Sequence, residues 1–208
     1  VPASGLVVPQ ALEDILADLP SWTLEAHFHS TNATAQSGSF LKKTVGNRLG
    51  FDFGVQAGFP YVAFDARLTS TAMANRVTLA ADQAVSNGVW THVAAQWNGT
   101  SRELKLIING NFIYRRTLGA TEGTPFDGYG TLYLGAATGG WSSASALDNV
   151  RFWSVARTLA EIGESRQELI AAGSSANLLR DYRFDDGGLT IEDFAHPGTV
   201  RYAIDSAN

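Results

Sequence analysis

The sequence predicts an all-β protein, an antiparallel two-sheet β-sandwich or jelly roll with two short peripheral helices. Many short segments alternate apolar with polar residues, which is the pattern of strands. Gly- and Asn-containing turns separate these segments, and only two stretches show a helical period. We expect one domain over residues 1–208, with a short helix at 9–19 and the sandwich at 21–207.

The first helix is predicted from the spacing of its apolar residues. Leu12, Ile15, Leu16 and Leu19 recur at i, i+3, i+4 and i+7, and Pro20 ends the run. One apolar face results, so we expect this helix to lie against a larger body.

After Pro20 the apolar residues recur at every second position. From Trp22 to Phe28 apolar residues alternate with polar ones, which indicates a half-buried strand. Residues 30–39 show no periodicity and predict an exposed loop. Further strands are expected at 47–55, 59–66, 90–97, 103–117, 130–136, 147–155 and 178–184.

Two local signals fix a hairpin and the second helix. Asn109-Gly110 stands between alternating runs, and Asn-Gly is the strongest short-range signal for a tight β-hairpin. Thr158 and Glu161 form a capping-box pattern, which begins a helix that we expect to end near Gly173.

Composition narrows the classes of function. The formal charge is −5, and the basic residues are scattered, which argues against binding to nucleic acid. No apolar run is long enough to span a membrane. There is no cysteine, which excludes disulfides and thiolate sites and favours a bacterial origin. The chain starts at Val1 and its one methionine is Met73, so we expect a piece of a longer protein.

Four segments cover nearly the whole chain in a fixed order, at 22–28, 90–110, 132–162 and 179–194. Together they resemble the bacterial laminin G-like domains of the concanavalin A-like lectin/glucanase superfamily. The resemblance implies a jelly-roll sandwich that recognises a ligand. Relatives usually carry an aromatic residue at the position of His27, and animal members carry a disulfide that this chain lacks.

Three histidines are candidates for chemistry. His27 and His29 are two apart on one predicted strand, so they share a face, and His92 lies on another strand. They could bind a metal, act as acid and base on a polysaccharide, or line a ligand site. The alternative is that His92 is structural and the other two line a polar outer face.

An enzyme of this superfamily is the alternative function. Glycosidases need two carboxylates that flank the scissile bond. The strand motif of laminarinase-like glycosidases is absent, and Glu25 is the one carboxylate predicted on the His27 face. We therefore predict no catalytic residue.

Calcium is the cofactor that the resemblance implies, because laminin G-like domains often bind it at a loop edge. Asp127 and Asp148 are the candidate ligands, since calcium takes several oxygen ligands. For Asp148 the alternative is a buried carboxylate that backbone N–H groups or an arginine, such as Arg151 or Arg183, satisfy.

Exposed aromatic side chains are the residues that would stack on a sugar ring. Trp141 lies in a Gly- and Ser-containing loop and is the best candidate, and Phe59 and Tyr61 beside a Gly turn come next. The alternative is that Trp141 folds back over one end of the sandwich. The remaining tryptophans fall in strand patterns and are predicted in the core: Trp22, Trp90, Trp97 and Trp153.

The sequence thus predicts a carbohydrate-binding or adhesion module of a longer, secreted or surface protein, with a polysaccharide, a glycoconjugate or a surface protein as partner. The alternatives are a polysaccharide-active lyase or glycosidase and a structural spacer or protein-binding domain.

Overall fold

The structure is a computed structural model that describes residues 6–8, 19–67, 73–125, 130–136, 145–185, 190–197 and 201–203. Its strands form a seven-stranded, a six-stranded and a two-stranded sheet, and the two large sheets are antiparallel. The predicted two-sheet sandwich is confirmed. The predicted helix at 9–19 lies outside the described residues except for Leu19.

The seven-stranded sheet has the order β1-β11-β3-β4-β5-β10, and β6 also pairs with β5. Its strands are β1 (Leu6–Val8), β3 (Gly38–Val45), β4 (Arg48–Gln56), β5 (Phe59–Arg67), β6 (Met73–Ala80), β10 (Thr124–Pro125) and β11 (Thr131–Ala136).

The six-stranded sheet has the order β13-β12-β2-β7-β8-β9. Its strands are β2 (Ser21–Ser30), β7 (Thr91–Asn98), β8 (Glu103–Ile108), β9 (Phe112–Thr117), β12 (Ser145–Trp153) and β13 (Leu178–Tyr182). A small sheet pairs β14 (Thr190–Glu192) with β15 (Arg201–Ala203), and the 3-10 turns are η3 (Ala33–Ala35) and η4 (Ala120–Glu122).

The core lies between the two large sheets. Strand β2 directs Trp22, Leu24, Ala26 and Phe28 into it, as the alternation predicts. Phe40, Phe51, Phe53 and Phe64 meet them from the other sheet. Trp22 and Trp97 lie in this core, as the sequence predicts. Trp153 is also buried, at 4% exposed, but it packs with Leu178 and Ala195 in a separate cluster and not between the two large sheets.

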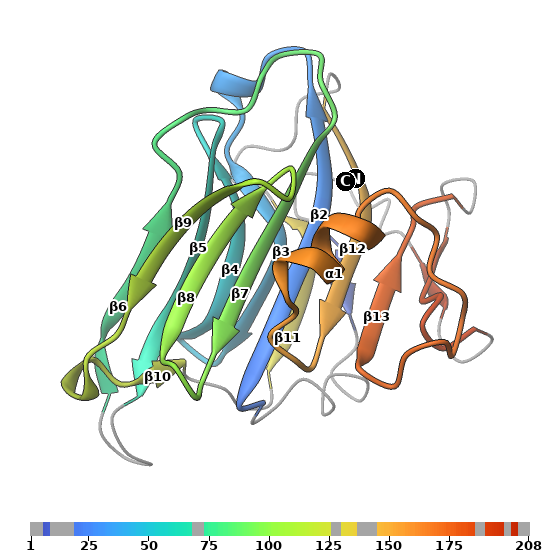
Figure 1. Cartoon of the computed structure of the whole chain (residues 1–208). Helices are drawn as coiled ribbons and strands as arrows, with labels where there is room; N and C mark the ends of the chain where they lie inside the picture. Colours follow the sequence, from blue (N-terminus) through green and yellow to red (C-terminus); the bar gives the residue numbers. More distant parts are fainter. Residues whose placement is uncertain are drawn as a thin grey trace.

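Helix α1 (Leu159–Ser165) covers the outer face of the six-stranded sheet, in front of β2 and β7 (Figure 1). Its Ile162 packs on Ala94 and Ile107. Because of this cover, Thr23 and Glu25 of β2 are also buried, so β2 is a central strand and not the half-buried strand that its alternation predicts.

The second helix begins as predicted, because Thr158 and Glu161 form the capping box. The predicted end near Gly173 is wrong, since the helix ends at Ser165 and Leu169 is 66% exposed. Arg151 explains this end, because its guanidinium binds the carbonyl oxygens of Ser165 and Glu168 that a longer helix would use.

Residues 30–39 match the predicted exposed loop only in part. Positions 31, 32, 34, 35 and 37 are exposed, but 38–39 belong to β3, and the segment contains η3, in which Ala33 is fully buried. The turn at Gly58 packs tightly against it: a Cβ on Gly58 would lie 2.7 Å from the carbonyl oxygen of Ala33, and its φ is +80°. Only glycine fits this place without a shift of the backbone.

Candidate functional site

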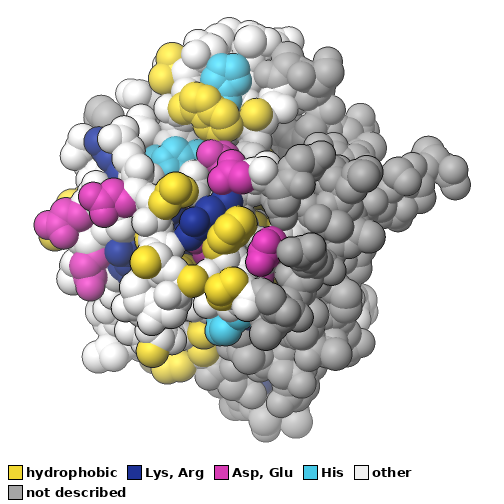
Figure 2. Space-filling view, turned by 90° about the vertical axis from the view of Figure 1, so that its right-hand side faces the viewer, with side chains coloured by type: hydrophobic (Ala, Val, Ile, Leu, Met, Phe, Trp, Pro, Cys, Tyr) yellow, Lys and Arg dark blue, Asp and Glu magenta, His cyan; other side chains and the backbone are white. Residues whose placement is uncertain are grey.

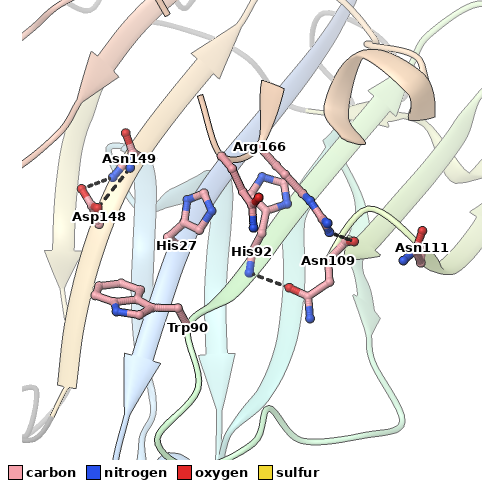
Figure 3. A pocket seen from close by; sticks show the side chains of 9 residues that line it. His27, Trp90, His92, Asn109, Asn111, Asp148, Asn149 and Arg166 are labelled. Carbon is pink, nitrogen blue, oxygen red and sulfur yellow. Dashed lines mark hydrogen bonds between the residues drawn. The ribbon is translucent and has the colours of Figure 1, made fainter. Parts of the chain in front are cut away.

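The outer face of the six-stranded sheet carries an open hollow with a volume of about 690 Å³, beside the C-terminal end of α1. Its floor consists of His27 from β2 and His92 from β7, which are paired in register. Their ring centroids lie 4.9 Å apart (Figure 3). Among the described residues, neither ring has a hydrogen-bond partner for Nδ1.

Asp148 and Asn149 of β12 form one wall of the hollow. The register of β12 against β2 shifts between Asp148 and Arg151, and Asn149 there has a φ of +47°. The Asp148 carboxylate accepts hydrogen bonds from the backbone N–H of Asn149 at 2.7 Å and from its side-chain amide at 3.0 Å. The bulge therefore fixes both polar side chains at the wall.

The opposite wall is the predicted Asn109-Gly110 hairpin turn together with residues just after α1. Asn109 and Gly110 have φ of +52° and +72°, as a tight primed turn requires. The Asn109 side chain accepts a hydrogen bond from the backbone N–H of His92 at 2.9 Å. Arg166 donates to the Asn109 carbonyl, so the turn is held from two sides.

Trp90 lies at the open end of the hollow, and Asn111 and Gln167 complete its lining. Trp90 is 48% exposed, so the prediction that it belongs to the core is wrong. It precedes β7 and has the parity of His92, which directs it to the outer face. The ring of His29 packs against it at a centroid distance of 5.4 Å.

A buried network of charges lies beneath the hollow. The Glu25 carboxylate accepts a hydrogen bond from Arg157 at 2.6 Å and pairs with Nε2 of His92 at 3.1 Å. Arg157 also donates to the carbonyl of Glu161 and lies over the ring of Trp153. The network ties the floor of the hollow to α1.

Nearby charges and burial set the protonation of the side chains that line the hollow. Burial lowers the pKa of His27 to about 4, and the nearby positive charges of His92 and Arg151 add to this effect. Burial raises the pKa of Asp148, and the negative charge of Asp185 acts in the same direction. His27 is therefore uncharged near neutral pH.

Glu25 behaves in the opposite way. Burial by itself would raise its pKa, but the hydrogen bond and charge of His92 and the charges of Arg157 and Arg151 hold that pKa below its ordinary value. A carboxylate that stays ionised and is 1% exposed is suited to hold the fold and not to donate a proton to a ligand.

The predicted ligand residues do not form one group. His27 and His92 line the hollow, and His29 supports Trp90. Phe59 and Tyr61 lie on the outer face of the other sheet, because the intervening Pro60 and the following Val62 are buried. Burial raises the pKa of Tyr61, and the neighbouring Asp52 adds to the rise.

Two of the predicted site residues lie outside the described residues: Trp141, predicted to stack on a sugar, and Asp127, a predicted calcium ligand. Within the described part of the chain, no group of three His, Asp or Glu side chains is arranged to hold a metal ion, so the three-histidine metal site is wrong. His29 packs on Trp90 and not with the other two histidines. The Asp148 carboxylate is bound by Asn149 and not by Arg151 or Arg183, which pair with Asp181.

Three lining residues were not predicted as ligand-binding residues, namely Asn149, Arg166 and Gln167. Asn149 falls in one of the family-like segments, but a β-bulge places its side chain, and the early end of a helix places Arg166 and Gln167. Asn109 was recognised only as a turn residue. The parity of Trp90 with His92 was the one signal that could have found the exposed tryptophan.

The space-filling view shows that the surface beside α1 is mixed in character, since histidine and acidic side chains lie next to hydrophobic and basic ones (Figure 2). The two packed sheets define a jelly-roll sandwich, and the open, polar hollow is a recess in its outer face. The chain belongs to the concanavalin A-like lectin/glucanases superfamily, because residues 7–163 match a laminin G-type family of that description.

Solved structures share the fold at low sequence identity. A protein from Bacteroides ovatus, described as a candidate carbohydrate-binding protein, has a TM-score of 0.57 and 17% identity over 90% of this chain and 55% of its own. This chain thus spans about half its length. The CBM40 of the Ruminococcus gnavus IT-sialidase, solved with α2,3-sialyllactose, has a TM-score of 0.55 and 17% identity over 78% of this chain and 91% of its own.

The binding domain of botulinum neurotoxin serotype D is a third neighbour, with a TM-score of 0.55 and 14% identity over 72% of this chain and 36% of its own. No curated protein matches the sequence. No helix in the described part of the chain is long and apolar enough to cross a membrane.

Proposed function

We propose that this chain is a non-catalytic carbohydrate-binding module that holds a glycan in the hollow beside Trp90. The observation that carries the proposal is an aromatic ring, 48% exposed, at the end of a recess whose rim consists mainly of side-chain amides. A flat ring stacks on the apolar face of a pyranose, and amides bind its hydroxyl groups.

The volume and polarity of the hollow support this use. Its volume of about 690 Å³ falls within the range of small-molecule sites, which is about 300–1,000 Å³. Asn109, Asn111, Asn149 and Gln167 offer both donors and acceptors. The hydrogen bonds to Asn109 and Asp148 hold two of these walls in place before any ligand binds.

The fold neighbours agree with this reading. One is described as a candidate carbohydrate-binding protein and another is a carbohydrate-binding module solved with a sialylated sugar. Such modules serve proteins that meet polysaccharides outside the cell, so we infer a place in a secreted or surface protein with further domains.

A polysaccharide-active enzyme is the second candidate, because His92 and Glu25 form a hydrogen-bonded pair under the hollow. Glu25 is buried and ionised, and of the described residues that line the hollow Asp148 is the one carboxylate. Two carboxylates that both reach the substrate are needed for glycosidase chemistry. We therefore favour binding over catalysis.

A glycan array tests the proposal, run with calcium and again with a chelator. We expect specific retention of at least one glycan, and loss of that signal for Trp90→Ala. Retention that disappears with the chelator would support calcium at Asp127 and Asp148, which remains a prediction. Release of product from a polysaccharide panel, abolished in His92→Ala, would favour the enzyme instead. No retained glycan would overturn the proposal and favour a structural spacer.

A further inference from the structure

A second, smaller recess lies next to the hollow, and we call it the end pocket. Its volume is about 150 Å³, and its lining includes Pro60, Val85, Val89, Thr91 and Tyr114. It lies between the segment 83–91, which leads into β7, and the hairpin where β8 ends and β9 begins. The loop is fixed there, because Tyr114 donates a hydrogen bond to Asp82 at 2.6 Å and Val85 donates to Gly58 at 3.0 Å.

Asn109 lines both the hollow and the end pocket, so the hairpin turn is a shared ridge between them. The ridge is rigid. The backbone N–H of Asn109 donates to the carbonyl of His92 at 2.8 Å, and its side chain accepts from the N–H of His92. A ligand that leaves the hollow across this turn therefore meets the end pocket next.

Two consecutive exposed hydrophobic residues join the two recesses. Val89 is 51% exposed and lines the end pocket, and Trp90 is 48% exposed and lines the hollow. They are two of only a few large hydrophobic side chains that the described residues leave exposed. An apolar surface that continues from one recess into the next suits a chain of sugar rings better than a single ring.

The charges of the two recesses indicate the class of sugar. None of the residues that line the end pocket carries a formal charge. In the hollow, the cation Arg166 is matched by the anion Asp148, and His92 is paired through Nε2 with the buried carboxylate of Glu25 beneath the floor. An acidic sugar would need an uncompensated cation close to its carboxylate.

We propose that the end pocket is a second subsite and that the ligand is a neutral oligosaccharide or polysaccharide chain. One sugar stacks on Trp90 in the hollow, and a neighbouring sugar lies across the Asn109 turn against Val89 and Tyr114. This inference rests on the proposed function and adds to it the length and the charge of the ligand.

Isothermal titration with oligosaccharides of increasing length tests the inference. The probes are cello-, xylo- and β-1,3-gluco-oligosaccharides of one to six units, with sialyllactose and an oligogalacturonide as acidic probes. For the wild type we expect one neutral series to bind, with affinity that rises on the order of tenfold from the shortest member to the longer ones, since a further apolar contact is buried.

Val89→Asp separates the second subsite from the first. It places a charge in the end pocket at an exposed position, so we expect normal folding, retained binding of the shortest ligand and loss of the gain with length. Leu159→Asp is the matched control, because Leu159 is 41% exposed at the other end of α1, and this variant should keep the gain.

The outcomes are distinct for the two proposals. Two outcomes overturn the second subsite and leave the proposed function standing. In the first, Trp90→Ala abolishes binding but the affinity of the wild type does not rise with ligand length. In the second, the affinity still rises with ligand length in Val89→Asp. Binding of acidic probes alone overturns the neutral class. Absence of binding to every neutral and acidic probe, together with an empty glycan array, overturns both.

Discussion

The guanidinium of Arg157 lies 2.6 Å from the carboxylate of Glu25, and the two side chains are 9% and 1% exposed. This pair joins the segment before α1 to the central strand of the six-stranded sheet. The same carboxylate pairs with His92, so one buried anion connects the helix, the sheet and the floor of the hollow. We therefore expect the shape of the hollow to depend on this anion.

Glu25→Ala should destabilise the fold strongly. It leaves the buried Arg157 without its carboxylate, and such a loss lowers the free energy of unfolding by about 3–5 kcal/mol. Urea denaturation of both proteins at pH 7 measures the difference. Glu103→Ala is the control, because Glu103 pairs with Lys105 where both side chains are partly exposed, and its loss should lower the free energy of unfolding by less than about 1 kcal/mol. A similarly small decrease in the free energy of unfolding in both variants would contradict the structural role of Glu25.

The lowered pKa of His27 makes the stability of the fold depend on pH. Its folded pKa of about 4 lies below its ordinary value of 6.5, so the unfolded chain binds a proton more readily. The free energy of unfolding therefore has its full value above pH 6.5 and falls as the pH drops towards 4. The fall is on the order of 2 kcal/mol once the partial exposure of His27 is allowed for.

The matched variant for this effect is His27→Gln, which keeps a polar side chain but does not titrate. Denaturation curves at a series of pH values should show a shallower loss between pH 6.5 and 4 for the variant than for the wild type. Parallel curves for the two proteins would show that His27 is not the group responsible.

Asp148→Asn should not weaken the fold at neutral pH. Burial raises the pKa of Asp148, which means that folding disfavours its charged form. The amide oxygen can still accept the hydrogen bond from the N–H of Asn149. Thermal melts at pH 7 should give a higher melting temperature for the variant, and melts at pH 3 should give no difference. A lower melting temperature at pH 7 would refute this view of the wall.

Much of the fold could be predicted from the sequence, because the signals were local. The alternation from Trp22 to Phe28, the Asn109-Gly110 turn and the Thr158 capping box each depend on neighbouring residues alone. The end of α1 could not be predicted, since Arg151 from a distant strand binds the carbonyls there. The burial of Ala33 likewise depends on a contact with the turn at Gly58.

The candidate site was predicted only in part, for a related reason. His27 and His92 could be placed on one face from strand parity, and the structure brings them together. Phe59 and Tyr61 were separate candidates for stacking on a sugar, and they lie on the other sheet. Strand parity tells which residues share a face of one strand, but the pairing of strands decides which strands share a sheet.

The most direct test of the account compares two exposed aromatic residues on opposite sheets. Trp90 is 48% and Phe59 38% exposed, so alanine should be tolerated at both positions, which melting temperatures will check. Isothermal titration with the glycan that the array retains best then measures the affinity of each variant. We predict that Trp90→Ala weakens binding by about tenfold or more, because a stacked ring is lost, and that Phe59→Ala leaves it unchanged. Unchanged affinity in Trp90→Ala, or a loss confined to Phe59→Ala, would contradict a glycan site in the hollow.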